Sequence, residues 1–182
     1  MACTGNLIVL QVATPPAATR AETRLIIRQA LRDALAPLLD CTAEKVPLFS
    51  QVGGMLALDI ADCRIGLSVS HEAGMSLGAI NLDGAVGIDL MQVDLKLAWQ
   101  DVARDYLGAA GYRRIAANPD ADQARAFARE WVALEACLKC HAVGLQEWSP
   151  KVLGRQSQAR ITVLDLPTRF VGALVTKMNI LK

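Results

Sequence analysis

The sequence has almost no excess charge of either sign. Its 182 residues include 19 lysines and arginines and 18 aspartates and glutamates, so the formal net charge is +1. A chain this balanced lacks the basic surface that attracts nucleic acid or an acidic membrane through charge alone. We therefore expect neither a nucleic-acid partner nor a membrane partner, and any anion-binding site must be local.

Long hydrophobic runs and an export signal are also absent from the pattern. No stretch approaches the roughly 18 consecutive apolar residues that a membrane-spanning helix needs. The apolar segment at residues 7–10 has no basic residue before it and ends at Gln11, which is unlike a secretory signal. We expect a soluble protein that stays in the cytoplasm.

Cysteines are few, and their number is odd. The five are Cys3, Cys41, Cys63, Cys137 and Cys140. Scattered cysteines in a chain without an export signal argue against a disulfide framework, so we expect reduced and mostly buried thiols. What the chain does have is a 53% share of apolar residues, which is enough for a substantial core.

The hydrophobic pattern predicts helices and strands in both halves of the chain. Leucines and isoleucines recur every three or four residues over residues 19–39, and the longest helical segment, 122–143, follows the start signal Asn118-Pro119-Asp120. A third helix is predicted over 95–107. Strands are predicted at 6–13, 55–61, 64–70, 75–81, 85–90, 159–166 and 169–176. This repetition indicates an α+β fold with two lobes, and we expect a ligand in the groove between them.

Three blocks carry the side chains best suited to chemistry. They are Ser68-Val69-Ser70-His71-Glu72, Val86-Gly87-Ile88-Asp89 and Trp131-Val132-Ala133-Leu134-Glu135-Ala136-Cys137-Leu138-Lys139. Glu135 and Lys139 are four residues apart on a predicted helix, so they emerge on one side, and Asp89 is predicted near the exit of its strand. Two carboxylates beside an ammonium group suit a magnesium-bound pyrophosphate. The alternative is an ordinary surface ion pair between Glu135 and Lys139, which stabilises a helix by about 0.3 kcal/mol.

Arginines form a row on the first predicted helix. Arg20, Arg24, Arg28 and Arg32 follow one another at four-residue intervals, so their side chains lie along one face. Such a row is either a solvated helix face or a ridge that binds phosphate. The spacing alone does not choose between the two.

The three blocks, in this order and at these separations, resemble the 4′-phosphopantetheinyl transferases, specifically the longer type that activates peptide, polyketide and fatty-acid synthases. The resemblance rests on Ser70-His71, on Gly87-Ile88-Asp89, and on Trp131, Glu135 and Lys139 followed by Gly144-Leu145, and it covers about residues 20–146. It implies a monomer of two similar lobes related by a pseudo-twofold axis, each a small, mainly antiparallel sheet packed on a long helix.

The resemblance also implies a reaction and a division of labour. The enzyme would transfer the 4′-phosphopantetheine arm of coenzyme A to a serine of an apo acyl- or peptidyl-carrier protein and release 3′,5′-ADP. The C-terminal lobe, residues 86–182, would hold Mg²⁺ through Asp89 and Glu135. Glu135 would also act as the base, and Lys139 would stabilise or protonate the departing 3′,5′-ADP.

The N-terminal lobe, residues 1–85, would bind coenzyme A. By the same resemblance, Ser70 and His71 would contact its phosphates, while Arg24 or Arg28 would bind the nucleotide end. Lys139, from the other lobe, would contribute to the same phosphate site.

Several positions depart from the family pattern. Met91 stands where many members have a second acid, and a thioether is a poor magnesium ligand, so either water or Glu72 would take its place. Leu134 replaces a lysine, and Gly53-Gly54-Met55 lies where a Gly-Lys-Pro is usual. These losses keep open a second function, a non-catalytic module of the same fold that binds coenzyme A or a carrier protein.

A third function comes from a different motif. Cys137-Leu138-Lys139-Cys140-His141 matches the C-x-x-C-H signature of covalent haem attachment in an electron carrier. Its place inside a predicted long helix and the lack of an evident second axial ligand argue against this assignment. A zinc site is equally weak, because a second cysteine or histidine pair at suitable spacing is absent.

Overall fold

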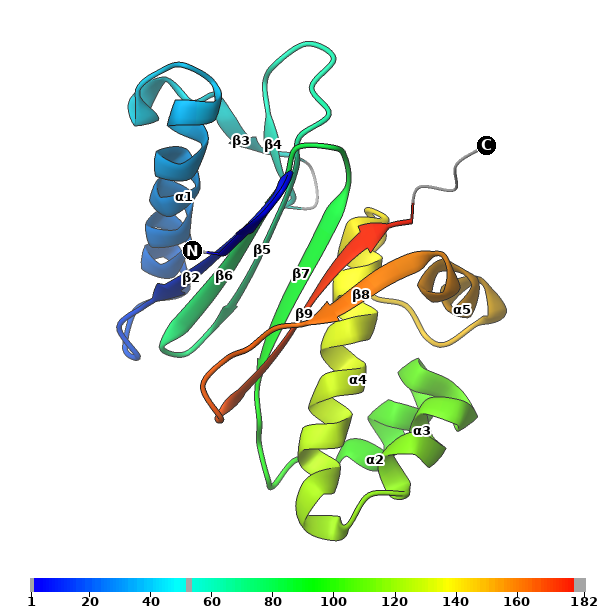
Figure 1. Ribbon diagram of the computed structural model, residues 1–182. Helices are drawn as coiled ribbons and strands as arrows, with labels where there is room; N and C mark the ends of the chain where they lie inside the picture. Colours follow the sequence, from blue (N-terminus) through cyan, green and yellow to red (C-terminus); the bar gives the residue numbers. More distant parts are fainter. Residues whose placement is uncertain (1, 52–53, 179–182) are drawn as a thin grey trace. The chain divides into compact units, whose positions relative to one another are not determined.

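The computed structural model describes residues 2–51 and 54–178 of the chain. The fold is α+β, with small antiparallel sheets and packed helices, as the sequence predicts (Figure 1). The chain divides into two compact units, Met1–Val86 and Gly87–Lys182. Each unit has a sheet and one long helix of its own.

The first unit is built on a four-stranded antiparallel sheet. Its strands run in the order β1 (Ala2–Thr4), β2 (Leu7–Ala13), β6 (Met75–Asn81) and β5 (Gly66–Glu72). β6 pairs along its whole length with both β2 and β5. A separate two-stranded sheet joins β3 (Leu48–Ser50) to β4 (Leu56–Leu58).

Helix α1 (Arg20–Leu35) covers one face of this sheet, and its start and packing follow from its sequence. Thr19 and Glu22 form a capping box that satisfies backbone donors of the first turn. Ile27, Leu31 and Leu35 are almost completely buried, at the spacing that keeps one helix face apolar. The helix continues as a 3₁₀ turn, η1 (Ala36–Leu38), and a second such turn, η2 (Ala43–Lys45), follows.

The second unit has a three-stranded sheet in the order β7 (Val86–Gln92), β9 (Phe170–Lys177) and β8 (Ala159–Val163). β8 and β9 are antiparallel. The long helix α4 (Asp120–Cys140) packs against β9. Most of β7 and β9 is buried, which is why both strands are nearly continuous apolar runs in the sequence.

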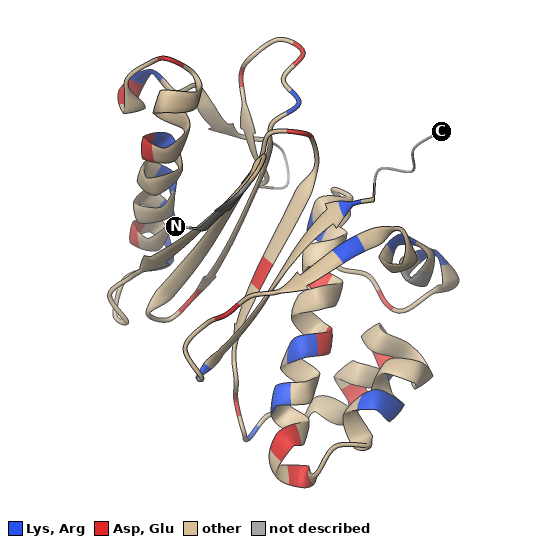
Figure 2. Ribbon diagram, viewed as in Figure 1, with Lys and Arg blue, Asp and Glu red and all other residues tan. Residues whose placement is uncertain are grey.

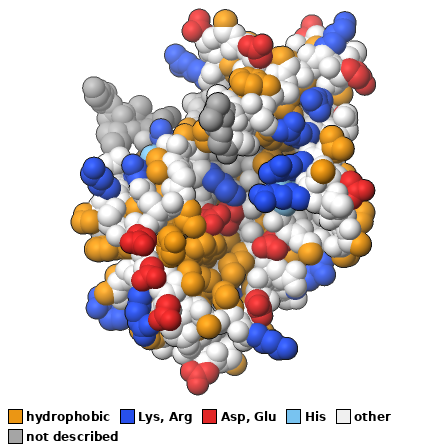
Figure 3. Space-filling view, turned by 180° about the vertical axis from the view of Figure 1, so that it is seen from behind, with side chains coloured by type: hydrophobic (Ala, Val, Ile, Leu, Met, Phe, Trp, Pro, Cys, Tyr) orange, Lys and Arg blue, Asp and Glu red, His pale blue; other side chains and the backbone are white. Residues whose placement is uncertain are grey.

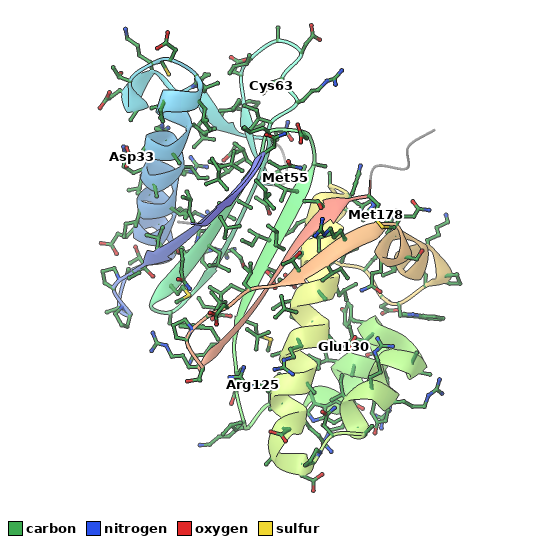
Figure 4. All side chains as sticks on the ribbon, in the orientation of Figure 1. Asp33, Met55, Cys63, Arg125, Glu130 and Met178 are labelled. Atoms are coloured by element: carbon green, nitrogen blue, oxygen red, sulfur yellow. The ribbon has the colours of Figure 1, made fainter. Side chains whose placement is uncertain are left out.

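Up to Met178, the described part of this unit has four shorter helical segments: α2 (Trp99–Val102), the π-helical turn η3 (Ala103–Leu107), α3 (Gly108–Ala116) and α5 (Pro150–Ser157). They share a hydrophobic core with α4 that includes Trp99, Phe127 and Leu134. Arg114 on α3 also holds Glu130 on α4 through two hydrogen bonds of 2.8 and 2.7 Å; Figure 4 labels Glu130 on the helix.

Three expectations about these elements need correction. The segment 55–61 forms a strand only at Leu56–Leu58, which pairs with β3, and a turn with positive φ at Asp62 follows it. The helix expected over 95–107 begins at Trp99 and changes to a π-helical turn. Helices α3 and α5 were not predicted, because α3 contains two glycines, which weaken the helical signal, and α5 is short.

The surface matches the balanced composition. On the face seen in Figure 3, acidic and basic side chains both occur, and hydrophobic side chains are exposed among them. Within residues 2–51 and 54–178, no helix is both long and apolar enough to cross a membrane.

Candidate active site

The candidate site begins with an unusually close contact between β7 and α4. A Cβ atom added to Gly87 would lie 1.8 Å from the carbonyl oxygen of Ala136 and 2.6 Å from the amide nitrogen of Cys140. Both are backbone atoms of α4, so a larger side chain has no room. Gly87 therefore allows the strand and the helix to meet backbone against backbone.

Asp89 uses this contact to reach the helix. Alternate residues of a strand point to the same face, so Asp89 faces α4 as Gly87 does. Its side chain is 5% exposed, and its Oδ1 accepts a 2.6 Å hydrogen bond from Nζ of Lys139. The sequence predicts Asp89 near the exit of its strand, but β7 continues to Gln92, so the carboxylate lies in the middle of a rigid element.

Lys139 is fixed by more than this one ion pair. Its Nζ also donates a 3.1 Å hydrogen bond to the backbone carbonyl oxygen of Ile88. The ammonium group thus binds a side chain and a backbone oxygen of the same strand. This arrangement places a cation firmly beside the Asp89 carboxylate.

Glu135 lies one helical turn before Lys139 and is half-buried. Burial raises the pKa of its carboxyl group, and the negative charge of Asp89 raises this pKa further. Lys139 and a hydrogen bond from the Trp131 side chain act in the opposite direction on the same pKa. Asp89, Glu135 and Lys139 therefore interact electrostatically within one unit; we refer to them as the carboxylate–lysine trio. Figure 2 shows one acidic residue on β7 and both signs of charge on α4.

The donor atoms of the trio fit a hard divalent cation. Two carboxylates supply the oxygen ligands that Mg²⁺ prefers, and Mg²⁺ commonly completes its shell with water and phosphate oxygens. The Lys139 ammonium shows that a cation is already held at the Asp89 carboxylate. In the part of the chain that the structure describes, no group of three or more histidine, cysteine or acidic residues forms a larger metal site.

The trio contains only two acids because the position two residues after Asp89 holds Met91. Met91 therefore points to the same face of β7 as Asp89, and it packs partly buried against the core around Phe127 and Leu134. Its thioether is part of a hydrophobic contact rather than an exposed polar site. The remaining ligands of a bound ion would have to come from elsewhere.

The residues predicted in the first unit lie on two different faces of its sheet. His71 is opposite Ser76 in the β5–β6 register, and its Nδ1 lies 3.0 Å from the Ser76 hydroxyl. Ser70 is buried and Glu72 is half-buried, and both point to the other face because side chains alternate along a strand. Gly78 of β6 shares the face of Ser76 and contacts Ile27 of α1. His71 is therefore on the side of the sheet that α1 covers, while Ser70 and Glu72 are on the opposite side.

The two predicted arginines also differ from each other. Arg24 is exposed, whereas Arg28 is half-buried and donates a hydrogen bond to the Ser50 hydroxyl on β3. Both belong to α1, which covers the side of the sheet on which His71 lies. Of the Gly53-Gly54-Met55 segment noted in the sequence, Gly53 lies outside the described residues.

The C-x-x-C-H motif is poorly placed for covalent chemistry. Cys137 and Cys140 belong to the last turn of α4, and 1% and 3% of their surfaces are exposed. Burial raises the pKa of the Cys137 thiol to about 11, and burial also raises the pKa of Cys140. His141 contacts the carbonyl oxygen of Cys137 through Nδ1 at 2.9 Å. Attachment of haem needs accessible, reactive thiols, so this geometry disfavours the electron-carrier hypothesis.

Sequence reasoning missed two parts of the site. It did not assign a role to Gly87, although a glycine two residues before a buried acid on a strand is a signal for close backbone approach. It also did not predict the contribution of the Ile88 carbonyl oxygen, because no side chain reports a backbone contact.

A comparison with protein families matches the segment of the chain that contains the trio. The family model of the 4′-phosphopantetheinyl transferase superfamily matches residues 85–169. The matched segment contains Asp89, Glu135 and Lys139 and begins one residue before β7. No curated protein matches the chain. The superfamily uses coenzyme A as a substrate and acts on carrier proteins, so the match indicates a transferase and phosphopantetheinyl transfer in general.

Proposed function

We propose that this protein transfers the 4′-phosphopantetheine arm of coenzyme A to a serine of an apo acyl- or peptidyl-carrier protein in a Mg²⁺-dependent reaction. The observation that carries the proposal is the carboxylate–lysine trio, which lies inside the segment matched by the superfamily. We propose further that the protein is of the longer, pseudo-dimeric type and acts as a cytoplasmic monomer.

Each member of the trio has a role in the proposed reaction. Asp89 and Glu135 would hold Mg²⁺, which supplies charge neutralisation at the pyrophosphate and acidifies a nearby hydroxyl group. Glu135 would accept the proton of the carrier serine; burial and the negative charge of Asp89 raise its pKa, which makes its carboxylate a stronger base. Lys139 would stabilise negative charge on the departing group.

The bond changes follow from these roles. The serine oxygen attacks the phosphorus atom that bears pantetheine, while its proton passes to Glu135. The bond from this phosphorus to the bridging pyrophosphate oxygen breaks, and 3′,5′-ADP leaves with the electron pair. The protein mainly positions the reactants and neutralises charge, so no covalent enzyme intermediate is needed.

Residues of the first unit would bind coenzyme A. His71, Arg24 and Arg28 would contact its phosphates and nucleotide, and their common side of the sheet supports a shared role. Ser70, which lies on the opposite face of the sheet from His71, is proposed as a separate phosphate contact. Glu72 is proposed as a third acidic ligand of the metal ion, in place of Met91. It lies on the same face of the sheet as Ser70.

The direct test is to incubate the protein with coenzyme A, Mg²⁺ and a panel of apo carrier proteins and to measure the intact mass of each carrier. Asp89→Ala and Glu135→Ala should each abolish transfer while circular dichroism shows an unchanged fold. Asp122→Ala, which removes an exposed acid from the same helix α4, is the matched control and should keep the wild-type rate. Full activity in both site variants would show that the site is assigned wrongly.

A second function is favoured by one observation, the packing of Met91 into the core where an acid is usual. It is a non-catalytic module that binds coenzyme A or a carrier protein. Calorimetry with coenzyme A, measured beside the transfer assay, distinguishes the two functions. Binding without transfer to any carrier supports the module, and transfer supports the enzyme.

A further inference from the structure

Lys139 occupies a position with the features of a cation site. Its ammonium nitrogen lies 2.6 Å from Asp89 Oδ1 and 3.1 Å from the carbonyl oxygen of Ile88. Carboxylate and backbone carbonyl oxygens are also the donors that hard metal cations use. The Asp89 side chain is 5% exposed and that of Lys139 is 33% exposed, so the carboxylate is the more deeply buried partner of the pair.

The charges at this position do not favour a second cation. The two carboxylates and the ammonium group together carry at most one net negative charge. A divalent ion would bring the site to a net positive charge, with the ion only a few ångströms from the ammonium group. Like charges at such a distance repel strongly in a partly buried environment. A pyrophosphate would restore the balance, because it brings negative oxygens that bind both the metal and the lysine.

We infer that Lys139 is a built-in counter-ion, which neutralises Asp89 in the substrate-free protein and must leave this carboxylate before a divalent metal binds there. The inference rests on the proposed function and deepens it. Without a pyrophosphate, a divalent metal binds weakly, because it competes with the ammonium group of Lys139 for the Asp89 carboxylate. The metal site becomes complete when a pyrophosphate draws the ammonium group away, so Lys139 couples metal binding to substrate binding.

The test measures metal affinity in the absence of coenzyme A. The free protein is titrated with Mn²⁺, and the unbound ion is followed by electron paramagnetic resonance. Lys139→Met removes the ammonium group but keeps an unbranched side chain, and it should bind Mn²⁺ at least about tenfold more tightly than the wild type. Lys139→Arg keeps the charge and should stay within about threefold of the wild type. Lys151→Met, which removes an exposed lysine of α5, should have no effect.

A second measurement uses the unmodified side chain. In protein with ¹⁵N-labelled lysine, the ammonium signal of Lys139 is assigned by its loss in Lys139→Arg. Addition of Mg²⁺ should shift or broaden this signal over the range of concentration at which the metal binds. This measurement also decides the question if Lys139→Met does not fold, which circular dichroism would reveal.

The outcomes separate this inference from the proposed function. Equal or weaker Mn²⁺ binding by a folded Lys139→Met, or a Lys139 signal that stays unchanged at saturating Mg²⁺, overturns the counter-ion role even if the wild type transfers phosphopantetheine. Tighter Mn²⁺ binding by Lys139→Met, together with a wild-type protein that transfers phosphopantetheine to no carrier, supports the counter-ion role and removes the transferase proposal.

Discussion

Both units pack a helix on a sheet at a strand glycine, but the two contacts differ in closeness. In the first unit, a Cβ atom added to Gly78 would meet the side-chain ends of Ile27 and Leu31 at 3.3 and 3.4 Å. In the second unit, a Cβ atom added to Gly87 would lie 1.8 Å from the backbone oxygen of Ala136. Helix α1 therefore rests on hydrophobic side chains, whereas α4 touches the backbone of β7.

This difference explains where the polar chemistry is found. Where two backbones touch, the side chains beside the contact are brought close together and become partly or almost completely buried. Asp89 and Lys139 are consequently paired at 2.6 Å. In the first unit, the helix stands off from the strand; Arg24 is exposed, and Nδ1 of His71 lies 3.0 Å from the Ser76 hydroxyl. The close approach of α4 to β7 thus brings the charges of the carboxylate–lysine trio together.

The largest expected effect comes from replacing each of these two glycines with alanine, which adds the missing Cβ atom. Gly87→Ala should lower the free energy of unfolding by about 3 kcal/mol or more, because the added methyl group meets backbone that cannot turn aside. Gly78→Ala should lower it by less than about 1 kcal/mol, because flexible side-chain ends can shift and the unfolded chain loses entropy. Urea denaturation of both variants measures the difference. Equal losses would remove the distinction between the two contacts.

The next effect separates the close packing from the charges it holds. The double variant Asp89→Asn with Lys139→Met removes the ion pair but keeps Gly87 and the size of both side chains. Its free energy of unfolding should stay within about 1 kcal/mol of the wild type, because a buried ion pair replaced as a whole costs little. Transfer to a carrier protein should fall at least about 100-fold, since charge stabilisation is lost. A variant that loses its fold instead would show that the charges, not the packing, hold β7 on α4.

The fold could be predicted from the sequence wherever the hydrophobic pattern is long. Helices α1 and α4 were predicted because their apolar residues recur over several turns, and β2, β5, β6, β7, β8 and β9 were predicted because branched residues end at turn signals. Helices α3 and α5 have no such pattern of useful length. Their form depends on contacts with α4, which a local pattern does not report.

The candidate site was predictable only in part, for a similar reason. The four-residue spacing of Glu135 and Lys139 on a helix places them on one side from sequence alone. Their meeting with Asp89 depends on how closely β7 approaches α4, which is decided by the backbone atoms around Gly87. The raised pKa of Glu135 is likewise a tertiary effect, because burial is its largest cause.

A smaller effect concerns the arginine row of α1. Arg24→Ala should raise the KM for coenzyme A about fivefold, or about 1 kcal/mol, with little change in kcat, because an exposed charge contributes modestly to binding. Arg64→Ala, an exposed arginine of the same unit outside this row, is the control and should leave KM unchanged. Steady-state kinetics at two salt concentrations measure both variants. An unchanged KM for Arg24→Ala would favour a solvated helix face.

The smallest expected effect sharpens the comparison through the pH dependence of stability. A carboxyl group with a raised pKa binds its proton more tightly in the folded than in the unfolded protein, so Glu135 makes the free energy of unfolding fall as the pH rises from 4.5 through the higher folded-state pKa. Glu135→Gln should flatten this decline, while Glu147→Gln, at an exposed position, should keep the wild-type slope. Urea midpoints between about pH 4 and 7, measured with a chelator present, test this. If the free energy of unfolding of Glu135→Gln declines as steeply with pH as that of the wild type, the close approach of β7 and α4 does not perturb this carboxyl group. The carboxylate–lysine trio would then be no more strongly coupled than His71 and Ser76 in the first unit.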